Sequence, residues 1–251
     1  EAGYSFDGTT TTLPRKLGIL MKKLGVPVVT VITQGAFHRD PLYNMLQIRD
    51  VQVSAHVKCL ATAEELKEKS VAELDALLDE AFSFDNFAWQ RDNRISIDVP
   101  FRADGLHRIL YKCPHCGAEG KMEGKGIRLT CNACGRQWEM DEFGQLRALE
   151  GETEFPHIPD WYTWERECVR KEIEDGAYLL DTDVQIGIQV NLDGICMIGS
   201  GHLTHDLSGF HLTGADGQLD YTQSPVASHT LYADYYWYEI GDVIRIGNNE
   251  F

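Results

Sequence analysis

The sequence predicts a multidomain protein that joins an α/β region, a four-cysteine ribbon and a small antiparallel β-domain. Three observations lead to this prediction. Residues 13–32 pass from a helix-start signal to a continuous apolar run. Two Cys-x2-Cys pairs lie within residues 113–134, and from residue 177 onward short strand patterns alternate with turn residues. We expect the domains to span residues 1–94, 95–150 and 151–251.

Charge divides the chain sharply. The formal net charge is −16 over 251 residues. Residues 1–138 hold 18 Lys and Arg against 17 Asp and Glu, whereas residues 139–251 hold 5 against 22. With a shift from Lys-bearing helices to Gly-, Asp- and Tyr-rich strands, this places a boundary near residues 145–155. So acidic a C-terminal part repels phosphate, which argues against broad binding to nucleic acid or anionic lipid. No run of 18 apolar residues occurs, so no membrane span is predicted.

The first predicted elements are a helix and a buried strand. Leu13-Pro14 follows a run of threonines and signals a helix start. Residues 15–24 carry a repeated apolar face, and Gly25 ends the helix. The continuous apolar run at 26–32 is typical of a strand buried on both faces of a parallel sheet. A turn, a helix, a glycine and a buried strand in this order indicate an α/β domain.

Residues 34–43 are predicted to form a loop after this strand. His38 and Arg39 would then lie at the C-terminal end of a parallel strand, where sites of α/β proteins form. A substrate role for either residue is one hypothesis. An ordinary polar loop is the alternative that the sequence favours.

The opening block resembles the glycerolipid acyltransferase superfamily, which acylates glycerol phosphate and lysophospholipids. That family carries a Phe-Pro-Glu-Gly-Thr-Arg-Ser block, often an Asp-Gly pair, a Leu-Pro-Phe-Lys-Lys-Gly helix and a Val-Pro-Ile-Val-Pro-Val strand. The matching positions here, in the same order, are Glu1, Ser5, Asp7-Gly8, Leu13 to Gly18 and Val26 to Val31. The chain departs from the family where Ala2 replaces Gly, Tyr4 stands near the phosphate-binding Arg, and Thr30 replaces Pro.

The resemblance implies the C-terminal half of an α/β acyltransferase domain over residues 1–94. It implies an acyl thioester donor, either acyl-CoA or acyl carrier protein, and a glycerol-phosphate or lysophospholipid acceptor. Glu1, Ser5 and Gly8 would border the phosphate of the acceptor. Because the family's Arg is replaced, Arg15 and Lys16 are the expected helpers. The implied location is the cytoplasm, with peripheral contact at the inner face of the membrane.

The family's catalytic His-x4-Asp pair precedes the Glu block. In the family that His deprotonates the acceptor hydroxyl while the Asp orients the ring. We therefore expect a preceding segment that carries the pair, and we expect the chain as given not to catalyse acyl transfer. His211 to Asp216 matches the pattern literally. It follows the Glu block and lies in a Gly-rich hairpin turn, so we interpret it as a chance match.

The four-cysteine motif is the most specific pattern in the chain. Cys113 and Cys116 form one Cys-x2-Cys pair, Cys131 and Cys134 form the second, and a Gly follows each pair. Two such pairs fit a tetrahedral Zn²⁺, and four thiolates leave no open coordination position, so the predicted metal is structural. Disulfides and an iron–sulfur centre are the alternatives; a reducing cytosol argues against the first and the spacing against the second. We expect strands at 127–130 and 137–140, as in a zinc ribbon.

Two helices and a β-domain complete the prediction. Thr62 to Glu65 is a capping box that begins a helix over 63–82, and Asp160 caps a helix over 161–175 with its glutamates on the polar face. The strands after residue 177 predict an antiparallel sandwich or small barrel, similar to pleckstrin-homology-like modules by analogy only. An aromatic cluster over residues 232–238 would be part core and part ligand or docking surface.

A different class of function remains open from the residues. The ribbon and the β-domain would then dock a protein partner or nucleic acid without catalysis, and the opening block would only fold. Several lysines and arginines of the ribbon favour nucleic acid, whereas its acidic flank argues against it.

Overall fold

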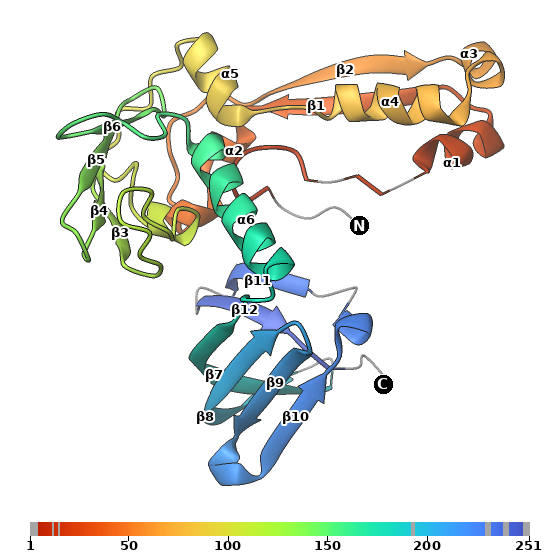
Figure 1. Ribbon diagram of the computed structural model, residues 1–251. Helices are drawn as coiled ribbons and strands as arrows, with labels where there is room; N and C mark the ends of the chain where they lie inside the picture. The colour runs from red at the N-terminus through yellow and green to blue at the C-terminus, as the bar shows by residue number, and fades with distance from the viewer. Residues whose placement is uncertain are drawn as a thin grey trace. The chain divides into compact units, whose positions relative to one another are not determined.

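The computed structural model describes residues 5–11, 13–14, 16–191, 194–228, 232–237 and 241–247 (Figure 1). The chain divides into two compact units, Glu1–Glu165 and Arg166–Phe251. The division falls later than the sequence-based boundary near residue 150, because the first turns of helix α6 (Ile158–Glu174) are buried in the first unit. The described residues contain helices and antiparallel sheets.

The first part of the structure is a two-stranded sheet with helices beside it (Figure 1). Strand β1 (Val28–Gln34) pairs antiparallel with β2 (Ser54–Ala61), with Val31 opposite Val57. The expectation of a parallel sheet is therefore wrong for this pair. The apolar run at 26–32 is typical of a strand buried on both faces, and this pattern led to the expectation. Along β1 exposed and more buried residues alternate instead, so one face is open.

Three helices pack at the end of this sheet that holds Val28 and Ala61, whereas residues 54–59 of β2 are exposed. Helix α1 (Leu17–Leu24) ends at Gly25 as predicted. The predicted helix at 63–82 is two helices, α3 (Ala63–Glu68) and α4 (Val71–Ala81), and each begins with a capping box. A second box at Ser70 and Glu73 starts α4 afresh, which explains the break. Their shared core is the α1–α4 cluster, made of Met21, Ala61, Leu66, Leu74 and Leu78.

The open face of the sheet exposes β-branched residues. Val29, Val31 and Val57 are 54%, 56% and 69% exposed. The outer edges of β1 and β2 have no strand partner among the described residues. Apolar side chains on one face and unpaired backbone edges are thus exposed together on this sheet.

A buried arginine network joins the following segment to the ribbon. Short elements fill this stretch, namely α2 (Ala36–Arg39), η1 (Leu42–Asn44), α5 (Asn86–Asp92) and η2 (Leu106–Arg108). Arg49 Nη2 donates to the Tyr43 hydroxyl at 2.9 Å, to Asn44 Oδ1 at 2.8 Å and to the Arg102 carbonyl at 3.1 Å. Arg102 Nε in turn donates to the Met140 carbonyl at 2.7 Å. Because buried cations are costly unless hydrogen-bonded, this network fixes residues 43–49 against the ribbon.

The ribbon is a four-stranded antiparallel sheet in the order β3-β4-β5-β6. Its strands are β3 (Met122–Lys125), β4 (Arg128–Cys131), β5 (Gln137–Met140) and β6 (Leu146–Ala148). The predicted strands at 127–130 and 137–140 are β4 and β5. The ribbon core buries Leu129, Trp138, Ile158 and Trp161 completely. Ribbon and α6 therefore share one hydrophobic core.

The second unit is antiparallel, as predicted. Strands β7 (Leu180–Asn191), β8 (Gly194–Asp206), β9 (Gly209–Gly214) and β10 (Leu219–Gln223) form one sheet in the order β10-β9-β8-β7. Strands β11 (Tyr232–Trp237) and β12 (Gly241–Arg245) pair separately. Short turns η3 (Ala215–Gly217) and η4 (Pro225–Ser228) connect strands. Most of the predicted aromatic cluster lies on β11, and Tyr238 lies outside the described residues. Among the helices described, none has the length and apolar character that crossing a bilayer requires.

Candidate metal centre

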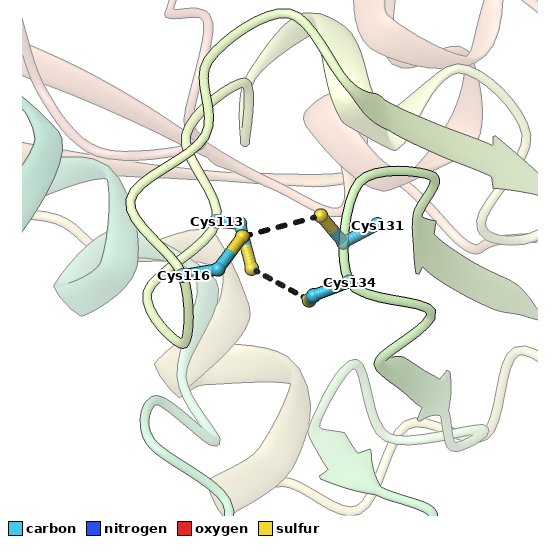
Figure 2. Close-up of side chains that lie close together, drawn as sticks. All are labelled: Cys113, Cys116, Cys131 and Cys134. Carbon is cyan, nitrogen blue, oxygen red and sulfur yellow. Dashed lines mark hydrogen bonds between the residues drawn. The ribbon is translucent and has the colours of Figure 1, made fainter.

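The two Cys-x2-Cys pairs converge in space. Their four Sγ atoms lie within 4.8 Å of one another and form a group that could hold a metal ion. Figure 2 shows two sulfur–sulfur contacts, Cys113 with Cys134 at 3.9 Å and Cys116 with Cys131 at 3.7 Å. Each joins one cysteine of the first pair to one of the second. A tetrahedron with metal–sulfur bonds of about 2.3 Å has edges of about 3.8 Å, so the spacing fits tetrahedral thiolate coordination.

The two knuckles have the same backbone structure. Gly117 N–H donates to the Cys113 carbonyl and Gly135 N–H to the Cys131 carbonyl, both at 2.8 Å. Both glycines are left-handed, with φ of 75° and 76°. A Cβ on either would meet nothing within 4 Å. The glycine requirement is therefore conformational rather than steric.

Burial and backbone amides act in opposite directions on the thiols. Burial raises the pKa of the Cys113 thiol, against backbone hydrogen bonds from Cys116 and His115. Burial is also the largest single influence on Cys131 and opposes its ionisation, but hydrogen bonds from the backbone of Cys134 and Ala133 and from neighbouring thiols together lower the pKa of that thiol. Amides that point at sulfur stabilise a thiolate, which is the form that binds metals. The knuckles thus already supply part of the charge compensation that ligation requires.

Glu154 joins the second knuckle to the ribbon core. Its carboxylate pairs with Arg136 Nε at 2.9 Å and accepts from Trp138 Nε1 at 3.0 Å. It also lies 3.6 Å from His115 Nδ1, whose side chain is 53% exposed. His115 is thus an exposed residue within the first Cys-x2-Cys pair. The role of Glu154 is not visible in the motif, because it comes from a segment twenty residues beyond Cys134.

Helix α6 supports the first knuckle from behind. Trp161 Nε1 donates to the Lys112 carbonyl at 3.0 Å, and Glu165 Oε1 accepts from the Lys112 N–H at 2.8 Å. Glu165 is fully buried, although the sequence placed it on the polar face of its helix. Burial raises the pKa of its carboxyl to about 8, against backbone hydrogen bonds from Lys112 and Tyr111. Trp161 and Glu165 lie one helical turn apart and so share a face of α6.

Of the residues predicted to bind phosphate, the structure describes Ser5, Gly8 and Lys16. Ser5 Oγ donates to the carbonyl of Thr9, four residues along its own turn. Gly8 is buried with φ of 82°, and a Cβ there would lie 2.9 Å from Phe37 Cε1. Lys16 lies at the start of α1 and lines a separate groove. Glu1 and Arg15 lie outside the described residues. The described part of the block therefore folds as a turn packed on the core.

The groove beside Lys16 has a volume of about 590 Å³. It runs between the approach to α1 and helix α4, where it is lined by Thr10, Leu13, Asp75 and Asp79 among others. Asp75 Oδ1 accepts from the Gly18 N–H at 2.6 Å. Two carboxylates beside one ammonium group make this groove a poor host for a phosphate.

Two histidines that the sequence analysis considered, His38 and His211, are each held by a hydrogen bond to a residue of another helix or strand. His38 lies in helix α2 rather than in a loop and is fully buried. Its Nε2 bonds to the Asn86 carbonyl at 2.8 Å, and burial lowers the pKa of the ring to about 4. His211 Nε2 pairs with Asp220 Oδ1 at 2.8 Å across β9 and β10. The literal His-x4-Asp match at Asp216 thus has no counterpart among the hydrogen bonds of this ring.

No protein-family model matches the chain, and neither a curated protein nor a solved structure matches it. The function therefore has to be inferred from the residues and from their geometry. The four-cysteine centre is the tightest cluster of ligating side chains in the part of the chain that the structure describes.

Proposed function

We propose that this chain carries the later part of a glycerolipid acyltransferase. The reaction moves an acyl group from a thioester, acyl-CoA or acyl carrier protein, to a hydroxyl of glycerol phosphate or a lysophospholipid. The observation that carries the proposal is the order of motifs from Glu1 through Asp7-Gly8 to the strand at Val26 to Val31. Four matched blocks in one order are more specific than any single short motif.

The open face and the unpaired edges of the sheet formed by β1 and β2 support this proposal. Helices pack against the end of the sheet at Val28 and Ala61, whereas Val31 and Val57 are exposed. The outer edges of both strands are free of partners within the described residues. Further strands of a larger sheet would pair with these edges and cover these side chains. Because β1 pairs antiparallel with β2, a parallel sheet no longer supports the proposal. The order of the motifs is its main support.

The roles of the block's residues follow from their contacts. Ser5 and Gly8 shape the turn, since Gly8 C=O accepts from Asn86 N–H at 2.9 Å and from Asn86 Nδ2 at 2.7 Å. Lys16 is an exposed cation, and under this proposal it contacts the acceptor's phosphate despite the two aspartates that share its groove. Under this proposal Glu1 and Arg15 complete that contact. Proton abstraction is assigned to the His-x4-Asp pair that the resemblance places before Glu1.

We also propose that the metal is Zn²⁺ with a structural role. Four cysteine thiolates are a donor set that Zn²⁺ favours, and the sulfur spacing fits its tetrahedral shell. A closed shell of four sulfurs leaves no position for substrate or water. The metal would therefore stabilise the ribbon and take no part in acyl transfer.

An assay on the longer coding product tests the enzyme proposal. Radiolabelled acyl-CoA and glycerol 3-phosphate or lysophosphatidic acid are supplied to the protein that includes the segment before Glu1. We expect labelled lipid, and we expect none when the His of the His-x4-Asp pair is replaced by Ala. A coding region without that pair would end the proposal. Metal analysis of the same preparation should give one zinc per chain.

A non-enzymatic docking protein is the second candidate. The exposed Val29, Val31 and Val57 favour it, because an apolar sheet face also suits a protein partner. The assay separates the two candidates. Zinc-loaded, folded protein that turns over neither acceptor favours the docking protein.

A further inference from the structure

Helix α6 holds the residue that precedes the first metal ligand by both of its backbone polar groups. Trp161 binds the carbonyl of Lys112 at 3.0 Å, and Glu165 binds its N–H at 2.8 Å. Trp161 and Glu165 are four residues apart, so both side chains leave the same face of the helix. We call these two contacts the α6 clasp.

The clasp is buried and reaches both knuckles. Cys113, Trp161 and Glu165 are all fully buried. The ring of Trp161 also packs edge-on against Trp138, with ring centroids 5.0 Å apart. Trp138 lies on β5, the strand that leaves the second knuckle. Displacement of α6 would therefore leave buried polar groups beside Cys113 unpaired and open the core behind Cys131.

We propose that the α6 clasp and the metal centre are coupled, so that metal binding fixes α6 and the clasp raises the affinity of the four thiols for metal. The inference rests on the proposal that these thiols hold Zn²⁺. Groups that orient a ligand from behind commonly change metal affinity by about 10–100-fold. Coupling between two equilibria is reciprocal, so a metal that α6 favours must favour α6 by the same factor.

The coupling has a consequence along the chain. Helix α6 runs to Glu174, beyond the division between the compact units at Glu165 and Arg166. Loss of the metal would therefore loosen the segment that leads into the second unit. Trp161 and Glu165 are positioning residues in this scheme, because neither touches the metal.

Zinc affinity measured by competition with a chromophoric chelator tests one direction. We expect Glu165→Ala to bind zinc about 10–100-fold more weakly than the parent chain. Glu165→Gln keeps an oxygen that accepts from Lys112 and should bind like the parent. Trp161→Phe keeps most of the ring but removes the donor, so it should show a smaller loss. The matched control is Glu167→Gln, an exposed position on the same helix.

Tryptic cleavage within α6 tests the other direction. Arg166, Arg170 and Lys171 are exposed cleavage sites of this helix. We expect chelation to speed cleavage there in the parent, and Glu165→Ala to speed it even at saturating zinc. Equal zinc affinity of Glu165→Ala and parent, or cleavage that ignores chelation, would overturn the coupling. A parent chain without zinc would instead overturn the metal assignment itself.

Discussion

The ribbon and the α1–α4 layer bury their apolar residues differently, although both belong to the same compact unit. By the α1–α4 layer we mean helices α1, α3 and α4 together with strands β1 and β2. In the ribbon the core is closed, with Trp138 and Trp161 fully buried between the strands and α6. In the α1–α4 layer Leu74 is equally buried, but the opposite sheet face leaves Val31 and Val57 more than half exposed. The difference indicates that the ribbon buries its own apolar core. The sheet, in contrast, exposes an apolar surface that suits further chain or a partner.

Loss of one metal ligand should have the largest effect. We expect Cys113→Ser to abolish stoichiometric zinc binding and the cooperative unfolding of the ribbon, because binding of structural zinc supplies about 10–16 kcal/mol in small zinc domains. Metal analysis and thermal unfolding measure this. Cys59→Ser is the control, since Cys59 is exposed on β2. A Cys113→Ser protein that keeps one zinc and the parent's melting temperature would contradict the closed-core account of the ribbon.

The α1–α4 layer should be sensitive where it is closed. Leu74→Ala is expected to lower the free energy of unfolding by about 2–5 kcal/mol through transfer and cavity terms. Zinc affinity should stay unchanged, because Leu74 belongs to the cluster with Met21 and Leu66 and not to the ribbon core. Ile19→Ala, at a half-exposed position of α1, is the matched control. Chemical denaturation of all three proteins gives the comparison.

The sequence predicted the ribbon better than the layer for a physical reason. Cys-x2-Cys spacing and the following glycines define a local turn, so each knuckle can be inferred from five consecutive residues. Strand direction is set by distant pairing, and nothing in residues 26–32 distinguishes a parallel from an antiparallel neighbour. The burial of Glu165 escaped prediction likewise, because its partner Lys112 lies 53 positions away along the chain.

Acid should weaken the ribbon side through His38. Its pKa in the folded chain is about 4 instead of 6.5, because the ring is buried. Between these two pKa values the ring is protonated in the unfolded chain and neutral in the folded chain. The contribution of His38 to the free energy of unfolding is therefore fully present above about pH 6.5. It falls by about 3 kcal/mol as the pH drops towards 4. Denaturation of parent and His38→Gln at several pH values isolates this share: the variant should gain on the parent as the pH falls.

A knuckle glycine should have a moderate effect. Gly135→Ala forces a left-handed conformation on a residue with a Cβ, at a cost of about 1–2 kcal/mol, although there is space for the methyl group. Gly194→Ala is the control, because Gly194 also has open space but no positive φ. Equal destabilisation by both substitutions would show that the conformation of the knuckle is not what Gly135 secures.

Substitutions on the open face of the sheet should have the smallest effect on the free energy of unfolding. Val57→Thr keeps the β-branched shape at a position that is 69% exposed. In the chain studied we expect a change within about 0.5 kcal/mol, as for other surface sites. Val51→Thr, at a position that is 5% exposed, should cost more because it buries a hydroxyl. In a protein that carries the further strands of the acyltransferase proposal, the two substitutions should become similar, because those strands would bury Val57 as well. If Val57→Thr stays neutral in that protein, the face that carries Val57 is a true surface. The sheet then no longer supports the acyltransferase proposal.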